Sequence, residues 1–270
     1  MMIQDIAPLH LDNQYKDKKA DKGSFVLSFR NDEILCHSNT NSFPHYEELN
    51  DPDTIYLFSI DNDEYYLTLD PVEISDGEYV SVRTFLSGEV ISKEKAYAAF
   101  TAYHLDKWYK DNRYCGRCGK GLVHDHKERA LRCPDCGNII YPRINPAVII
   151  GVINKDKIIL TRYAHGYRHN ALIAGFTEIG ETLEECVKRE VMEEVGLNVK
   201  NIRYYKSQPW GIAQDILMGF YCEVDGDDTI RVDENELKSA IWTKREDIEL
   251  QPVEYSLTNE MMKMFKEGRQ

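Results

Sequence analysis

Hydrophobic and polar positions alternate over short runs in the first third of the chain. Between residues 24 and 83 the runs SFVLSF, EILCHS, IYLFSI, YYLTL and YVSVRTF are rich in β-branched and aromatic residues, and turn signals such as Asp76-Gly77 separate them. This pattern predicts an antiparallel β domain. Residues 1–23 are polar, and we expect a flexible segment there.

A helical period replaces the alternation after Ser92. From there to about Lys110, aromatic and apolar residues recur at steps of three and four. Ser92 is a suitable N-cap, and Glu94 is favourably placed in a first helical turn. We therefore expect an amphipathic helix that ends the N-terminal domain, residues 24–110, and packs its aromatic face into the core.

Longer apolar runs characterise residues 143–270. Pro146-AVIIGVI and Lys157-IILTRY predict two strands around a turn at residues 154–156. A long helix follows a short third strand, and a second helix is expected near the C-terminus. Strands mixed with helices in this way indicate an α/β or α+β sandwich. The further strands are expected near residues 171–174, 201–207, 216–224 and 240–243, and the last helix near residues 258–266.

Composition and charge restrict the class of protein. The 270 residues include no apolar run approaching the roughly 18–20 residues of a membrane span, and the N-terminus has no apolar core of the signal-peptide type. A cytoplasmic location is the resulting expectation. The net charge of −13 disfavours a broad basic surface for nucleic acid, although bound metal ions can neutralise charge locally.

Four of the seven cysteines form two C-x-x-C pairs in residues 111–142. Two such knuckles can place four thiolates tetrahedrally around zinc, and four protein ligands leave no open position, which favours a structural site. A disulfide-bonded cluster is disfavoured in a reducing compartment. Zinc ribbons also bind nucleic acid, so that function remains open. The predicted zinc ligands are Cys115, Cys118, Cys133 and Cys136.

A helix rich in carboxylates follows the predicted third strand. Thr182 and Glu185 fit a capping box, and an apolar stripe runs along one face of the helix. Glu190, Glu193 and Glu194 lie together on the other face, where like charges at this spacing repel. A divalent cation with hard oxygen ligands, magnesium or manganese, would compensate for the repulsion. A solvated acidic face is the alternative.

The stretch Gly175-FTEIGETLEECVKREVMEEVG-Leu197 resembles the Nudix box, G-x5-E-x7-R-E-U-x-E-E-x-G-U, at every position. The resemblance implies an α/β/α sandwich that hydrolyses a nucleoside diphosphate linked to another group. It implies that Glu190, Glu194 and the carbonyl of Ala174 bind the catalytic metal ions and that Glu193 binds a metal or activates water. It also implies a Glu181–Arg189 pair, and Glu236 matches a further metal-binding glutamate.

The wider organisation resembles the NADH pyrophosphatase subfamily from about residue 24 to the end. The shared features are a β-rich N-terminal domain, the ribbon, Tyr141-PRINPAVI, and a box preceded by Ala174-Gly175-Phe176. The resemblance implies cleavage of NADH or NAD to nicotinamide mononucleotide and AMP, removal of NAD caps from RNA, and a homodimer. The substrate-binding residues that it implies are Arg83, Glu128, Tyr141, Phe176, Gln208, Pro209, Trp210, Gly211, Ile212, Ala213, Gln214, Asp215 and Thr258.

One motif departs from the subfamily pattern. Where S-Q-P-W-P-F-P-x-S is expected, the chain has Ser207-QPWGIAQD. An aromatic residue and two prolines are lost, which loosens this wall of the expected substrate pocket, and Asp215 adds negative charge. ADP-ribose, a dinucleoside polyphosphate or FAD is therefore an alternative substrate. A nucleic-acid-binding protein with an inactive box is the third hypothesis.

Overall fold

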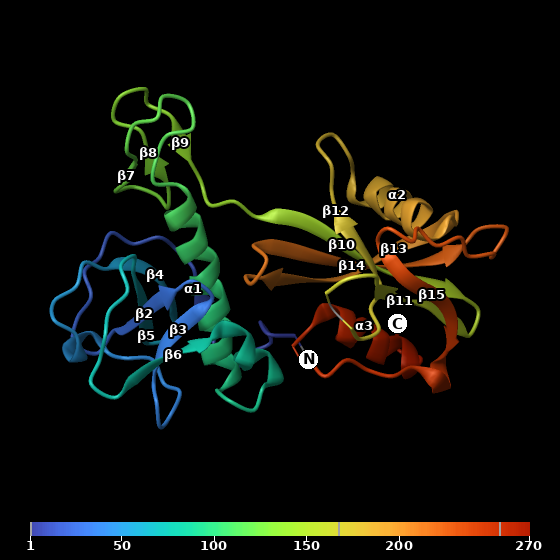
Figure 1. Cartoon of the computed structure of the whole chain (residues 1–270), viewed down its shortest axis with the longest axis horizontal. Coiled ribbons are helices and arrows are strands. Elements are labelled where there is room, and N and C mark those ends of the chain that lie inside the picture. Colours follow the sequence, from blue (N-terminus) through green and yellow to red (C-terminus); the bar gives the residue numbers. More distant parts are fainter. Residues whose placement is uncertain (1, 167, 254) are drawn as a thin grey trace. The chain divides into compact units, whose positions relative to one another are not determined.

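The computed structural model describes residues 2–166, 168–253 and 255–270 (Figure 1). The chain forms two compact units. One contains residues 3–144 together with residues 211–214. The other contains residues 145–210 and 215–270 together with Met2.

The first unit is built on a mixed sheet with the strand order β1-β4-β5-β2-β3-β6. The predicted β domain is present, but β2 and β5 run parallel, which differs from the purely antiparallel expectation. Strand direction follows from which strands meet in space, and β2 pairs with a strand distant in sequence. The bounds are β1 Leu11–Asp12, β2 Phe25–Arg30, β3 Glu33–His37, β4 Ile55–Ile60, β5 Asp63–Thr68 and β6 Gly77–Ser81.

Helix α1, Lys93–Asp111, begins after the N-cap residue Ser92, as predicted. Its buried side chains include Phe100, Tyr103 and Trp108, and the ring of Tyr103 lies 5.5 Å from that of Phe29 on β2. The aromatic face of α1 therefore packs into the core of this unit. This unit also contains short 3₁₀ helices at Tyr46–Glu48 and Val82–Ser87.

The first 23 residues differ from the flexible segment that their polarity predicts. Leu11 and Asp12 pair with β4, and the side chains of Ile3 and Ile6 are buried. The phenolic hydroxyl of Tyr15 donates a hydrogen bond to the carbonyl of Asp125 at 2.9 Å. These partners are distant in sequence, so local composition contains no trace of them.

The cysteine region adds a three-stranded sheet to this unit, in the order β7-β8-β9. Arg129, between β7 and β8, donates a hydrogen bond to the carbonyl of Leu57 on β4. The ribbon is thus tied to the N-terminal sheet. Its strands are β7 Val123–His124, β8 Leu131–Arg132 and β9 Ile139–Ile140.

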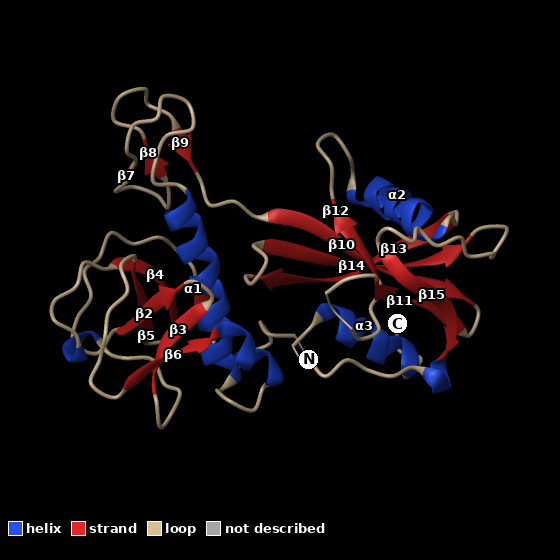
Figure 2. Cartoon of the chain, in the orientation of Figure 1, coloured by secondary structure: helices blue, strands red, loops and turns tan. Residues whose placement is uncertain are grey.

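The second unit is a sheet with a helix on each face (Figure 2). Its strand order is β13-β14-β10-β11-β15, with β12 paired to β10, and β10 runs parallel to β14. The predicted sandwich is confirmed. The strands are β10 Asn145–Asn154, β11 Lys157–Tyr163, β12 Ile173–Phe176, β13 Val199–Trp210, β14 Asp215–Val224 and β15 Leu237–Lys244, and the helices are α2 Leu183–Val195 and α3 Leu257–Lys266.

The continuous apolar run of β10 follows from its two buried faces. Val148 and Val152 pack with the buried residues of α2, whereas Ile149 and Ile153 pack with those of α3. Alternate side chains of a strand point to opposite faces of the sheet, so both sets must be apolar. Among the described residues, no helix is long and apolar enough to cross a membrane.

Candidate active site and zinc site

Helix α2 begins and ends where its sequence predicts. The hydroxyl of Thr182 accepts a hydrogen bond from the backbone N–H of Glu185, and the Glu185 carboxylate accepts one from the N–H of Thr182 at 2.8 Å. The predicted capping box is therefore confirmed. Gly196 ends the helix with a φ of 68°, in the left-handed region that favours glycine.

The carboxylates of α2 do not form a solvated face. The side chains of Cys186, Val187, Val191 and Val195 are buried against the sheet, but Glu190 and Glu194 are buried too, at 8% and 2% exposure. Glu193 alone of the three is well exposed. The alternative of a solvated acidic face is therefore wrong for Glu190 and Glu194, because β12 covers the side of the helix from which they project.

Glu194 carries the most perturbed carboxylate of this region. Burial raises its pKa to about 8, and the neighbouring charge of Glu190 acts in the same direction. The backbone N–H of Ala174 on β12 opposes that rise by hydrogen bonding. Among the described residues, the second carboxylate oxygen, Oε2, is buried without a hydrogen-bond partner. A divalent cation would satisfy this oxygen, so the residues present fit such a metal.

Gly175 provides the space that Glu190 occupies. A Cβ atom at position 175 would lie 2.0 Å from the carboxyl carbon of Glu190 and 2.1 Å from its Oε1. Any larger residue would therefore displace the carboxylate. The first glycine of the box is required for close approach of strand and helix, rather than for a turn.

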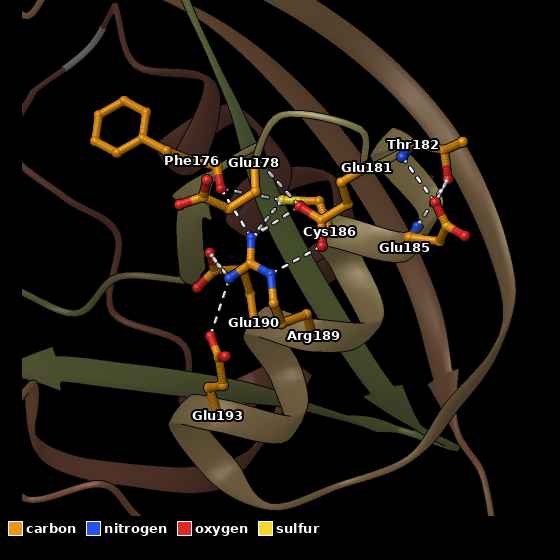
Figure 3. A network of polar contacts seen from close by, with 9 residues as sticks. All are labelled: Phe176, Glu178, Glu181, Thr182, Glu185, Cys186, Arg189, Glu190 and Glu193. Atoms are coloured by element: carbon orange, nitrogen blue, oxygen red, sulfur yellow. Dashed lines mark hydrogen bonds and ion pairs between the residues drawn. The ribbon is translucent and has the colours of Figure 1, made fainter.

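Arg189 links three carboxylates of the box (Figure 3). Its guanidinium binds Glu181 through Nε at 2.8 Å and Nη2 at 2.9 Å, so the predicted pair is confirmed. Nη1 donates to Glu190 at 2.7 Å and to Glu193 at 2.9 Å. The hydrogen bonds from Arg189 lower the pKa of Glu181 to about 2. Arg189 thus offsets the repulsion along the helix.

Arg189 also holds the loop that precedes α2. Its Nη2 donates to the backbone carbonyl of Phe176 at 2.9 Å. The Phe176 side chain extends away from this network, and 56% of it is exposed (Figure 3). An exposed aromatic ring at the edge of the carboxylate region is available to stack on a planar ligand.

Glu236, predicted from the resemblance to bind metal, lies close enough to the helix carboxylates for its charge to act on them. Its charge contributes to the raised pKa of Glu190 and of Glu194. It also acts on Tyr163, whose pKa is raised to about 12 chiefly by burial. Tyr163 is a neighbour of the site that sequence reasoning missed. Its position at the end of β11 is the one signal that could have found it.

The four predicted zinc ligands are brought together in the ribbon. Their sulfur atoms all lie within 4.8 Å of one another, with 3.6 Å between Cys115 and Cys136 and 3.4 Å between Cys118 and Cys133. A zinc tetrahedron has sulfur atoms about 3.8 Å apart, whereas a disulfide bond is about 2.05 Å long. None of the four forms a disulfide. The thiolates therefore fit structural zinc.

The knuckles also stabilise thiolates through the backbone. The N–H of Arg117 is the main cause that lowers the pKa of Cys115 to about 6. Gly119 and Gly137 occupy equivalent places after the two C-x-x-C pairs, with φ of 75° and 71°. Their N–H groups donate to the carbonyls of Cys115 and Cys133.

Two of the predicted substrate residues in the second unit have structural partners. Gln208 is fully buried, its amide donates to the carbonyl of Tyr255 at 2.6 Å, and its oxygen accepts from the N–H of Leu257 at 2.6 Å. Asp215 is also buried and accepts a hydrogen bond from Asn145. Pro209 and Trp210 end β13 and are half-buried, as is Thr258 in the first turn of α3.

The remaining predicted substrate residues lie in the first unit. The Tyr141 hydroxyl donates to Glu128 at 2.9 Å, and both side chains are exposed. Arg83 is exposed in the 3₁₀ helix Val82–Ser87. At Gly211 a Cβ would lie 2.0 Å from the carbonyl oxygen of Phe100 in α1, so this position of the altered motif requires glycine. Ile212, Ala213 and Gln214 follow, with Arg143 bound to Gln214 at 3.0 Å.

Comparison with known families agrees with these two sites. Residues 143–265 match the model of the NUDIX domain. The chain therefore contains a NUDIX domain. Residues 110–141 match the NADH pyrophosphatase zinc ribbon domain, so the predicted combination of the two is confirmed.

Proteins named NAD-capped RNA hydrolase NudC, from Escherichia coli O9:H4 and Escherichia fergusonii, are 40% identical to the chain over 151 residues. The match covers 55% of this chain and 58% of each relative, so it spans little more than half of their length. The crystal structure of a NUDIX hydrolase from Nitrosomonas europaea is similar with a TM-score of 0.51 at 21% identity. It covers 58% of this chain and 92% of that one, and the likeness concerns the fold.

Proposed function

We propose that this protein is a metal-dependent NAD diphosphatase. It hydrolyses the pyrophosphate of NADH or NAD to nicotinamide mononucleotide and AMP, and it removes NAD caps from the 5′ ends of RNA. Support comes from the NUDIX domain joined to an NADH pyrophosphatase ribbon, and from the similarity to NAD-capped RNA hydrolases.

The observation that carries the proposal is the buried pair Glu190 and Glu194. Two adjacent carboxylates at 8% and 2% exposure are costly to bury unless a cation joins them. Hard oxygen ligands suit magnesium or manganese. In our proposal Glu190, Glu194, Glu236 and the carbonyl of Ala174 would hold these ions, which would supply Lewis-acid chemistry at the phosphoryl group.

The other residues bind and orient the substrate in this proposal. Glu193 is the exposed carboxylate beside the pair, and it accepts the proton of the attacking water. Phe176 stacks on a base of the dinucleotide with its exposed ring. Gln208 acts indirectly, because its buried amide fixes β13 to the start of α3. The ribbon zinc is structural.

We further propose a cytoplasmic homodimer. A reducing compartment keeps the ribbon thiolates available for zinc. Static light scattering at several concentrations tests the dimer, and a mass equal to one chain at all of them contradicts it.

A second candidate is a NUDIX hydrolase of ADP-ribose, FAD or a dinucleoside polyphosphate. It is favoured by the altered stretch after Trp210, where Gly211 replaces the subfamily proline and packs against the carbonyl of Phe100. This packing shapes the chain differently from a proline-rich segment, and the difference favours a substrate without nicotinamide.

The decisive experiment is product analysis by liquid chromatography. The zinc-loaded protein is incubated with Mg²⁺ or Mn²⁺ and, in parallel, NADH, NAD, ADP-ribose, FAD and a dinucleoside polyphosphate. Equal release of AMP and reduced nicotinamide mononucleotide from NADH as the fastest reaction supports the proposal. Faster cleavage of another substrate moves the assignment to the second candidate. Tight RNA binding without cleavage of any dinucleotide or capped RNA indicates a binding protein.

A further inference from the structure

A cavity of about 710 Å³ lies at the end of β11 in the NUDIX unit. The described residues that line it include Arg162, Arg168, Lys238 and His165, and none of them is a carboxylate. The chain has 46 acidic residues and a net charge of −13. Among the described residues, the lining of this cavity therefore carries three permanent cations and no acid, against the negative net charge of the chain.

Within the described part of the chain, the three cations have no acidic partner. Arg162 donates to the neutral amide oxygen of Asn170 at 2.9 Å. Among the ion pairs of the described residues, none involves Arg162, Arg168 or Lys238. All three side chains are exposed. Their charges are therefore available to a ligand, and the cavity has a positive potential suited to an anion.

Backbone pairing explains how two of the cations reach the same cavity. Arg162 ends the regular pairing of β11 with β15, where it is opposite Ser239. The register then shifts, so that Tyr163 is opposite Leu237 and Lys238 is left in the bulge. A bulge re-aims side chains, and here it places Lys238 beside the end of β11.

The cavity adjoins the carboxylate cluster. Tyr163 and Ala164 line it, and the N–H of Ala164 donates to the carbonyl of Glu236 at 2.9 Å. Glu236 in turn lies near Glu190 and Glu194. A substrate whose pyrophosphate meets these carboxylates through metal ions would therefore present its next anionic group to the cavity.

We propose that this cavity binds a phosphate that the substrate carries beyond its scissile pyrophosphate. Guanidinium groups bind phosphate oxygens in pairs, and a lysine adds a point charge. The phosphate has two possible sources: the phosphodiester that follows a capped nucleotide in RNA, or a 2′-phosphate on the dinucleotide itself. The inference rests on the proposed function, since it extends the substrate of the same site.

The test compares Arg168→Gln/Lys238→Gln with a control, Lys155→Gln/Lys263→Gln. The control removes the same charge from two exposed side chains of the same unit, outside the cavity. Rates are measured with NADH, NADPH and an NAD-capped RNA oligonucleotide. We expect the cavity variant to retain NADH hydrolysis within about twofold and to lose roughly tenfold in kcat/KM on the substrate that carries the bound phosphate. Loss on NADPH alone or on RNA alone identifies the source.

A binding measurement separates failure of this inference from failure of the proposed function. In a Glu194→Gln background, anisotropy of the labelled capped RNA and competition by NADPH are followed at several salt concentrations. If RNA is the ligand, the cavity variant lowers the salt slope of log K by about 0.7, since this is the contribution of one phosphate contact on a single strand.

Two results overturn the inference. One is equal loss on NADH, NADPH and capped RNA, which would assign the cations to the scissile pyrophosphate. The other is a cavity variant that matches the control on every substrate and in binding. If instead the wild-type protein cleaves none of the dinucleotides, the proposed function fails, and the binding measurement still decides whether the cavity recognises the additional phosphate.

Discussion

The ribbon and helix α2 each gather residues for a metal ion, but they do so differently. Among the described residues, only the four cysteines have ligand atoms that all lie within 4.8 Å of one another. The carboxylates of α2 form no such group, and Glu190 is bound to Arg189 at 2.7 Å. The ribbon ligands are assembled by the fold. Of the two buried carboxylates, Glu190 is held by Arg189, which a cation would have to displace, whereas one oxygen of Glu194 has no partner among the described residues.

This difference matches the two uses of metals in proteins. A closed set of four protein ligands contributes to folding and leaves no position for substrate. A metal site made of a few carboxylate oxygens leaves coordination positions open for water and phosphate. Such a site also buries negative charges that have too few partners in the protein alone. The pKa of Glu194, which burial raises to about 8, shows the cost of burying such a charge most clearly.

Replacing Glu194 by Gln should produce the largest effect on activity and the smallest on folding. We expect hydrolysis to fall about a thousandfold, equivalent to about 4 kcal/mol, because the proposed metal ligand is lost. The melting temperature of the metal-free protein should hold or rise, because a buried carboxyl group is replaced by a neutral amide. Steady-state kinetics and calorimetry measure both. Activity within tenfold of wild type would remove Glu194 from the metal site.

Cys133→Ser should instead act mainly on folding. The ribbon loses its bound zinc and unfolds, while the NUDIX unit retains its own core. Zinc content and limited proteolysis of residues 111–142 report the change. Cys36→Ala is the control, because this buried cysteine lies outside the ribbon, and its variant should keep zinc. A Cys133→Ser protein that retains zinc and resists proteolysis would contradict the closed-site interpretation.

Gly175→Ala should impair the carboxylate site without touching the ribbon. The added methyl group would lie 2.0 Å from the carboxyl carbon of Glu190, so that side chain must move. We expect activity to fall about 10- to 100-fold, the usual loss when the residues that orient a metal ligand are changed. The zinc content should stay unchanged. Gly116→Ala in the ribbon is a matched control, because a Cβ at that position would meet no atom within 4 Å. Equal losses in both variants would argue against the packing explanation.

Glu181→Gln is the mildest of these substitutions. We expect it to lower the free energy of unfolding by an amount that depends on pH. The pKa of Glu181 is lowered to about 2 in the folded protein by Arg189, against an ordinary value of 4.5. Its contribution to stability is therefore complete above pH 4.5 and is lost as the pH falls towards 2. We expect the variant to be less stable by about 1–2 kcal/mol at neutral pH, and equal to wild type near pH 2. Urea unfolding at both pH values measures the difference, and a constant difference would exclude the ion pair as its cause.

Local sequence was sufficient for the features whose partners are near in the chain. The two C-x-x-C pairs predicted the zinc ligands, because a tight knuckle brings its two sulfur atoms together in any fold. The capping box of α2 and the Glu181–Arg189 pair are equally local, and the structure contains both. The apolar runs also predicted β10 and β11 of the NUDIX unit, since a strand buried on both faces must be apolar over most of its length.

Sequence by itself therefore determined the ribbon, the box helix and the strands around it, because these depend on spacing along the chain. Only the tertiary structure decided which carboxylates are buried, since β12 had to pack against α2 before Glu190 and Glu194 could leave solvent. It also decided the pairing of β1 with β4, the burial of Gln208 and the cavity lined by Arg162 and Lys238. These features depend on partners tens of residues away, and no local pattern of residues specifies such distances.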